Sequence, residues 1–445
     1  MTRPGTAATL AGKSTVSSSR KWLLAILLLA LILRVCAACL LQYLLETRWN
    51  RDFLIEGDAE GYWILAQKIV AGEDYSIYTP PRYALRMPGF PALLAIPVWL
   101  FGPNLFAARL FLAVVDTVAC WLVYRLGRQM FDERVGLVAA FLGAISPAMI
   151  GFFSTILSET AFAITLLWSL LAGDALRTSL ESRENPIWSA VTVRNCCWLG
   201  VALAAGVMMR PSWILAGPIV AVLLWLTCSR RWSGFWAGCL ATGIMVLLLL
   251  PWGIRNQQVT GHFTLTTFWM GPSLYDGLNP EATGDSNMEF YDRDRLMETM
   301  SEYDVDQHYR KAAWSYLFKH PGRGVELAGK KILRYWSPWP NAAQFGAWWM
   351  RGGLALYTIP IFLLAVWGIT ILVRRSGGAH GSGDAGLLSS KIWSVAILAG
   401  PVLYFAVIHM FFVSSLRYRL PAEYPLLIPA AFGLLQWRAR GKTTT

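Results

Sequence analysis

Long apolar runs alternate with polar segments along the whole chain, and their lengths predict a helical membrane protein. A helix needs roughly 17–25 mainly apolar residues to cross a bilayer. Three of the runs are shorter than this, and we expect their helices to extend into the polar sequence beside them. The ten predicted spans lie near residues 22–45, 104–125, 135–153, 160–173, 195–209, 211–228, 233–252, 346–373, 392–413 and 421–437.

The apolar stretch 88–101 is treated differently from these spans. It has only 14 residues and contains Pro88, Pro91 and Pro97. Apolar runs of this length are more often interfacial or re-entrant than spanning. We therefore predict a juxtamembrane helix here, within a first outer loop that covers residues 46–103.

Composition supports the membrane assignment. Only 15% of the residues are charged and 55% are hydrophobic, and the chain has 22 Trp. Soluble domains carry about 25% charged residues, and Trp is enriched where membranes meet water. A soluble enzyme, a disordered chain and a secreted disulfide scaffold are excluded.

The net charge is +12, and the excess of basic residues is concentrated on one predicted side of the membrane. With residues 1–21 in the cytoplasm, the cytoplasmic segments hold 18 Lys/Arg against 6 acids, whereas 46–87 and 253–345 together hold 15 against 18. This is the positive-inside asymmetry. It predicts a cell (inner) membrane protein with both termini cytoplasmic. No basic cluster with interleaved aromatic residues stands outside the spans, so no nucleic-acid partner is predicted.

The topology divides the chain into five parts. We expect a cytoplasmic tail at 1–21, a membrane module at 22–252, a large outer loop at 253–345, C-terminal transmembrane helices at 346–437 and a second cytoplasmic tail at 438–445. The large outer loop includes a predicted helix near 288–318. This large outer loop is either a solvated cap over the membrane domain or a lid that binds a substrate.

Two charges fall in the middle of predicted spans. Arg34 lies midway along the first span and Asp116 midway along the second, which runs in the opposite direction. At about 1.5 Å per residue they reach similar depths. Because unpaired charges in lipid are costly, we expect them to form a structural ion pair between helices rather than a proton path.

Two further acids lie at the predicted outer face. Asp58 precedes an amphipathic run that includes Tyr62, and Glu159 begins the fourth span. Each has a simple structural interpretation as a helix N-cap. Two carboxylates brought to one face by separate helices are also what a base-assisted displacement requires.

The histidines and cysteines suggest no bound metal ion or other cofactor. The five histidines have no paired metal-ligand spacing, and all seven cysteines lie in or beside predicted spans. Intramembrane cysteines usually pack as small apolar residues. No metal site is predicted, and a requirement for a divalent cation stays open.

An ordered set of motifs resembles a family of membrane glycosyltransferases. The chain is similar to the GT-C superfamily and, within it, to glycosyltransferase family 39, which includes protein O-mannosyltransferases and the aminoarabinose transferase of lipid A. The motifs are 57-GDAEGYWILAQKIVAGEDY-75, 85-LRMPGFPALLA-95, 107-AARL-110, 123-VYRLGRQMFDERVGLVAAFLGAISP-147, 154-STILSETAF-162, 209-MRPSW-213, 250-LPWGIRN-256 and 417-RYRLPAEYPLL-427.

The resemblance implies an all-α polytopic GT-C fold and a set of roles. Asp58 would contact or deprotonate the acceptor hydroxyl, and Glu159 would be a second catalytic acid. The matching motifs supply the candidates for substrate binding, which are Arg86 near the donor phosphate, Tyr62, Arg210, Arg255, Arg417, Tyr418 and Arg419.

The implied reaction moves a sugar from a polyprenyl-phosphate donor to a hydroxyl of a lipid, glycan or protein at the outer face, with inversion. Arginines suit such a donor because a guanidinium binds phosphate oxygens in pairs and stays charged. Two alternatives stay open. One is a transporter or flippase for a lipid-linked saccharide, which would usually show internal repeats; the other is an O-antigen ligase or polymerase.

Overall fold

Helices account for nearly all regular structure in the computed structural model, which describes residues 7–182, 186–341, 346–374 and 384–443. In this part of the chain, each predicted apolar run is mainly helical, and extended pairing is confined to one bridge between Ile77 and Arg82. The α-helices are α1 (Ala7–Leu44), α2 (Asp58–Ala71), α3 (Gly89–Phe101), α4 (Leu105–Met130), α5 (Glu133–Ala144), α6 (Pro147–Phe152), α7 (Glu159–Glu181), α8 (Ala190–Met209), α9 (Ala216–Thr227), α10 (Arg231–Thr260), α11 (Met270–Gly277), α12 (Glu289–Asp294), α13 (Glu302–Lys319), α14 (Pro321–Tyr335), α15 (Trp348–Arg374), α16 (Asp384–Ile408) and α17 (Leu416–Thr443).

Seven of the described helices are long and apolar enough to cross a membrane by themselves. They are α1, α4, α7, α8, α10, α15 and α16. The predicted span at 135–153 is a bent pair instead, because Pro147 starts a new helix and the two pieces meet at 47°. The predicted span at 211–228 is a shorter apolar helix. The chain is thus a multi-pass membrane protein, with fewer spans that qualify alone than the ten apolar runs suggest.

The tenth predicted span is the polar helix α17. Its residues 419–433 are buried almost without interruption, because α4, α5, α7, α15 and α16 pack around it. A helix enclosed by other helices does not meet lipid, so charges and prolines are tolerated in it when they are paired inside the bundle. Arg419 and Glu423 form such a pair, with Nε 2.5 Å from Oε1.

The predicted ion pair in the middle of the bundle is confirmed. Arg34 Nε lies 2.5 Å from Asp116 Oδ2, and both side chains are almost fully buried. The other Asp116 oxygen accepts a hydrogen bond from the Tyr424 hydroxyl at 2.6 Å. Arg34 also donates to the carbonyls of Ala144 and Gly143. The pair therefore joins α1, α4, α5 and α17, which is a structural role.

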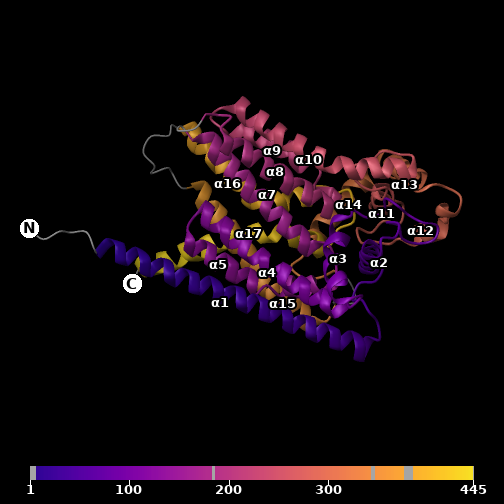
Figure 1. Cartoon of the computed structure of the whole chain (residues 1–445), viewed down its shortest axis with the longest axis horizontal. Helices are drawn as coiled ribbons and strands as arrows, with labels where there is room; N and C mark the ends of the chain where they lie inside the picture. The colour runs from indigo at the N-terminus through magenta and orange to yellow at the C-terminus, as the bar shows by residue number, and fades with distance from the viewer. Residues whose placement is uncertain (1–6, 183–185, 342–345, 375–383, 444–445) are drawn as a thin grey trace, which may run out of the picture.

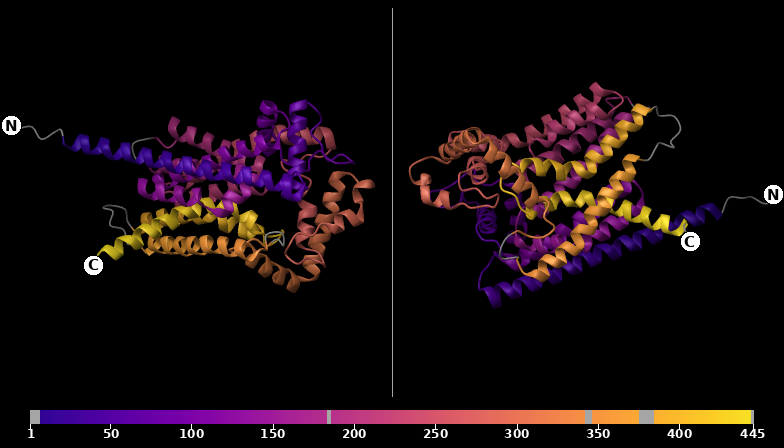
Figure 2. Two further views of the ribbon diagram at one scale, coloured as in Figure 1. Left: turned by 90° about the horizontal axis from the view of Figure 1, so that it is seen from below. Right: turned by 180° about the vertical axis from the view of Figure 1, so that it is seen from behind.

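The two predicted outer loops meet at one end of the bundle. Figure 1 shows α2, α3 and α11–α14 at the end opposite the first turns of α1 and the last turns of α17. Figure 2 shows α1 running along the outside of the bundle, consistent with its many exposed apolar side chains. The arrangement agrees with the charge count, which placed both loops on one side and both termini on the other.

Local structure in the loops was predicted only in part. The juxtamembrane helix at 88–101 and the helix start at Asp58 are confirmed as α3 and α2. The single helix predicted at 288–318 is wrong, since α12 ends at Asp294 and α13 begins after Ser301, whose side chain caps it. Helices α11 and α14 were not predicted. The buried positions Leu327, Lys331 and Tyr335 of α14 are four residues apart, a helical signal that the polar composition obscured.

Candidate active site

Five charged residues from distant parts of the chain meet at the loop end of the bundle. Each stands at or near the end of a helix, where the chain emerges from the packed region. They are Asp58 at the start of α2, Arg86 just before α3, Glu159 at the start of α7, Arg210 just after α8 and Arg417 in the first turn of α17. We call these five residues the charged cluster.

Asp58 is held between two guanidinium groups. Arg86 Nη2 lies 2.5 Å from one carboxylate oxygen and Arg417 Nη2 lies 2.7 Å from the other. Burial by itself would raise the pKa of Asp58, but Arg86 and Arg417 outweigh it and hold that pKa well below its usual range. Asp58 is therefore ionised at neutral pH and is a weak base while both arginines stay in place.

The two N-cap interpretations are wrong. Gly57, with φ 73°, takes the cap position of α2, and Ser158 takes that of α7. The Glu159 carboxylate is buried, and its Oε1 lies 2.9 Å from Arg417 Nε and 3.7 Å from Arg210 Nη1. Arg417 thus bridges the two carboxylates that the sequence singled out.

The charged cluster has unused capacity for an anion. It contains three cations and two anions. Two buried nitrogens, Arg86 Nε and Arg210 Nη1, make no hydrogen bond within the described residues, while Arg417 Nε is engaged by the Glu159 carboxylate. A buried donor without a partner costs about 1–3 kcal/mol, and a phosphate or similar oxyanion would satisfy several such donors together.

Aromatic rings lie beside these guanidinium groups at cation–π distance. The Arg86 guanidinium lies 5.1 Å from the centre of the Tyr62 ring. Tyr418 stands between the other two arginines, 5.3 Å from Arg210 and 5.1 Å from Arg417. The predicted binding residues Tyr62 and Tyr418 therefore belong to the site as supports for the cations.

Two predicted binding residues do not join the charged cluster. Arg419 is fully buried and pairs with Glu423, and it donates to the backbone carbonyls of Tyr335 and Ser337. It follows Arg417 by two helical positions, so the two side chains point to nearly opposite sides of α17. Arg255 is also occupied, since it donates to the carbonyls of Tyr83 and Tyr75 at 2.6 and 2.7 Å.

Sequence reasoning also missed residues that support the site. Glu302 accepts hydrogen bonds from the backbone N–H groups of Tyr83 and Ala84, which lie 219 and 218 residues away in sequence. A lone Glu in a polar loop gives no signal of such a distant partner. Within the described part of the chain, no group of three His, Cys, Asp or Glu is placed to hold a metal ion.

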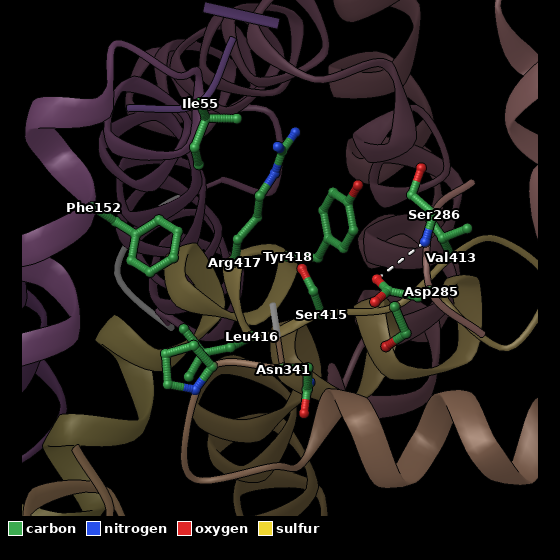
Figure 3. Close-up of a pocket in the computed structure, with 12 residues that line it drawn as sticks. Ile55, Phe152, Asp285, Ser286, Asn341, Val413, Ser415, Leu416, Arg417 and Tyr418 are labelled. Carbon is green, nitrogen blue, oxygen red and sulfur yellow. Dashed lines mark hydrogen bonds between the residues drawn. The ribbon is translucent and has the colours of Figure 1, made fainter. Parts of the chain in front are cut away.

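A cavity of about 190 Å³ opens beside Arg417 and Tyr418. Figure 3 shows Ile55 and Phe152 on one side of it and Asp285 and Ser286, from the large outer loop, on the other. The wall is mainly apolar and includes several polar side chains. Space for a substrate group is thus available next to the charged cluster.

Comparisons with known proteins agree with this architecture. Residues 85–254 match the family model described as dolichyl-phosphate-mannose-protein mannosyltransferase. Over 95% of the chain, the structure resembles ArnT from Cupriavidus metallidurans bound to undecaprenyl phosphate, with a TM-score of 0.55, 14% identity and 62% of that chain covered. The chain has the GT-C fold. Archaeoglobus fulgidus AglB, solved with an inhibitory peptide and a dolichol-phosphate, shares the fold at a TM-score of 0.57 and 14% identity, over 95% of this chain and 52% of its own.

Curated relatives match less than half of the chain. The undecaprenyl phosphate-alpha-4-amino-4-deoxy-L-arabinose arabinosyl transferase of Edwardsiella ictaluri is 28% identical over 174 residues, or 39% of this chain. The transferase of the same name from Pseudomonas aeruginosa strain LESB58 is 25% identical over 239 residues, or 49% of this chain. The match spans 30% of the first relative's length and 40% of the second's.

Proposed function

We propose that the protein is a membrane glycosyltransferase that moves a sugar from a polyprenyl-phosphate donor to an acceptor hydroxyl. The main support is the charged cluster, in which three arginines surround two carboxylates and two buried guanidinium nitrogens make no hydrogen bond within the described residues. The names of the similar transferases, and the polyprenyl phosphates bound in the two solved GT-C structures, support the same donor class.

In this proposal, Arg86, Arg417 and Arg210 hold the donor phosphate. The phosphodiester carries one negative charge before reaction, and a second develops as the bond between the anomeric carbon and the phosphate oxygen breaks. Preorganised guanidinium groups in a partly dry site stabilise that growing charge, and loss of one such donor typically costs about 2.7–4 kcal/mol of transition-state stabilisation. The net positive charge of the cluster suits this change.

Asp58 takes the acceptor proton in the proposed reaction. The acceptor oxygen attacks the anomeric carbon, its proton passes to the carboxylate, and the bonding electrons leave with the polyprenyl phosphate. Donor binding prepares the base, because phosphate oxygens compete for the N–H groups of Arg86 and Arg417 that now hold Asp58. Once those contacts weaken, the pKa of Asp58 rises toward its usual value. Glu159 keeps Arg417 in place and is the second candidate for the base.

Transfer of labelled sugar tests the proposal. The purified protein in nanodiscs is incubated with synthetic undecaprenyl-phosphate sugars and an envelope extract as acceptor. We expect a labelled product with the wild type and little with Arg417→Ala. No transfer from any donor, with no binding of undecaprenyl phosphate, would refute the proposal. Parallel reactions with and without EDTA decide whether a divalent cation takes part.

The proposed site faces the periplasm or the exterior, which the charge asymmetry supports. In a cysteine-free background, Ser286→Cys should react with an impermeant maleimide in spheroplasts. Ser229→Cys, in the exposed turn between α9 and α10, should react only after lysis. Labelling of Ser229→Cys alone in spheroplasts would reverse the orientation.

The alternative functions receive less support. Transporters bind their substrates near the middle of the bilayer, whereas the charged cluster lies at one end of the bundle. The mid-depth charges Arg34 and Asp116 are fully engaged with each other and with the backbone. An O-antigen ligase or polymerase was expected to differ in fold, and this chain has the GT-C fold.

A further inference from the structure

The segment that carries Arg86 takes its shape from other parts of the chain. Residues 83–87 form neither helix nor strand. The Glu302 carboxylate, at the start of α13, accepts the N–H of Tyr83 at 2.9 Å and that of Ala84 at 3.1 Å. Glu302 belongs to the large outer loop, so a residue of one loop binds the backbone of the other, two and three residues before Arg86.

Neighbouring backbone groups of the same segment are also bound from outside it. Arg255 donates to the Tyr83 carbonyl at 2.6 Å, and the Phe268 N–H donates to the Ala84 carbonyl at 2.9 Å. The Tyr75 hydroxyl donates to the carbonyl of Met87 at 3.2 Å. The backbone groups of this irregular segment thus find their hydrogen-bond partners outside the segment, which ties its conformation to other parts of the chain.

Glu302 is an unusual residue for a merely structural loop. It is only 9% exposed, and no Lys or Arg of the described chain lies within ion-pair distance of it. Within the described residues, its carboxylate accepts hydrogen bonds only from the N–H groups of Tyr83 and Ala84. Burial raises the pKa of Glu302, against the lowering effect of these two N–H donors. Burial of a carboxylate at this position costs free energy unless its hydrogen bonds to residues 83 and 84 offset that cost.

The segment that carries Arg417 is held by the same outer loop. Residues 411–415, between α16 and α17, are also irregular. Lys331 of α14 is fully buried and donates to the carbonyls of Met410 and Phe411 at 3.1 and 2.9 Å. Arg334, one turn further along α14, donates to the Ser414 carbonyl at 3.2 Å. The contacts end just before the helical turn that presents Arg417.

We propose that the large outer loop is a frame that sets the spacing of Arg86 and Arg417, with Glu302 and Lys331 as its positioning residues. The two arginines already contact opposite oxygens of Asp58, so a shift of either segment changes the width of the anion site. The loop is then more than a passive cap over the membrane domain. This inference rests on the proposed function, because it assigns the spacing to the donor phosphate.

The first experiment measures binding of sugar-free undecaprenyl phosphate to the full-length protein in nanodiscs. Glu302→Ala frees two backbone donors and should weaken this binding about tenfold, the lower end of what loss of a supporting hydrogen-bond partner costs at metal sites. The matched control is Glu298→Ala, an exposed acid of the same loop, which should bind like the wild type. Equal affinity of folded Glu302→Ala and wild type would overturn the proposal.

A double-mutant cycle separates positioning from general destabilisation. If Glu302 acts through Arg86, then Glu302→Ala should cause little further loss in an Arg86→Ala background, because the misplaced group is already absent. Additive losses would show that Glu302 acts elsewhere and would overturn the assignment. The same cycle with Lys331→Met and Arg417→Ala tests the other half of the frame.

A conservative variant covers the case in which Glu302→Ala does not fold. Glu302→Gln keeps one side-chain oxygen, and one Glu302 oxygen already accepts both N–H groups. We expect this variant to retain most of the affinity. A folded Glu302→Gln with the loss expected of the alanine variant would contradict the hydrogen-bond mechanism. If the wild type itself binds no better than Arg86→Ala and Arg417→Ala, the phosphate site fails and the proposed function fails with it.

Discussion

Replacing Asp58 by Asn tests the most specific part of the proposed mechanism. The substitution keeps the size of the side chain and one of its two acceptor atoms, but it removes the charge and the basic oxygen. The two Asp58 oxygens contact different arginines at 2.5 and 2.7 Å. An Asn can therefore accept from Arg86 or from Arg417, and its amide group will face the other.

The expected effects of this substitution differ in size for stability, donor affinity and transfer rate. One lost hydrogen bond to a charged group costs about 1.5–3 kcal/mol, so the variant should melt earlier but still fold. The charged cluster gains one unit of positive charge, so affinity for undecaprenyl phosphate should hold or rise. Loss of a general base should slow transfer by about 10²–10⁴-fold, which corresponds to roughly 3–5 kcal/mol in the barrier.

The assay measures the three quantities on the same preparation. Transfer of labelled sugar from a synthetic polyprenyl-phosphate donor is followed in nanodiscs, undecaprenyl phosphate affinity is measured separately, and thermal unfolding reports the fold. Glu60→Gln is the matched control, because Glu60 is an exposed acid on the same helix. It should resemble the wild type in all three measurements.

Two results would refute this assignment. A folded Asp58→Asn variant with nearly full transfer would show that Asp58 is not the base, and Glu159→Gln would then be the next variant to test. A variant that loses undecaprenyl phosphate binding together with transfer would show that Asp58 assembles the phosphate site instead.

Three other predictions concern buried charges. Arg34→Leu or Asp116→Leu alone should cost about 3–5 kcal/mol, because each leaves a buried charge unpaired, while the double variant recovers much of the thermal stability; additive losses would contradict the pair. Arg419→Ala should lower the melting temperature but, unlike Arg417→Ala, leave undecaprenyl phosphate affinity of the folded protein unchanged, and a matching loss of affinity would return Arg419 to the site. Burial lowers the pKa of Lys331 to about 8, against the opposing effect of a nearby carboxylate, whereas the unfolded value is about 10.4. At a pH between these two pKa values, the unfolded chain binds more protons than the folded one. The stability of the wild type relative to Lys331→Met should therefore rise with pH in that window, by up to about 1.4 kcal/mol per pH unit. A difference in melting temperature that stays constant with pH would contradict this.

The helical membrane architecture could be predicted from the sequence because lipid constrains each span separately. A span must be apolar and helical whatever its neighbours are, so the apolar runs located the helices and the charge bias grouped the loops. The Arg34–Asp116 pair followed from the same constraint, since depth in a bilayer scales with position along a helix. The enclosed helix α17, which does not face lipid, departs from the expected composition.

The candidate site could be predicted only at the level of individual residues. Asp58, Arg86, Glu159 and Arg417 were selected by motif and by their position at the outer face, and the structure brings them together. Arg419 was grouped with Arg417 because the two are close in sequence. Helical geometry separates them, because positions two apart on a helix point in nearly opposite directions.

The support of the site depended on tertiary structure alone. The backbone before Arg86 and the turn before Arg417 are irregular, and no local pattern specifies their conformation. Glu302 and Lys331 hold them through hydrogen bonds to backbone atoms. Backbone N–H and carbonyl groups are common to almost all residues, so the sequence does not show which of them are bound. The sequence by itself thus determined most of the apolar helices and placed the two outer loops together at one end of the bundle. The distances between charges at the site were decided by long-range contacts, because backbone partners leave no trace in the identity of the residues that they hold.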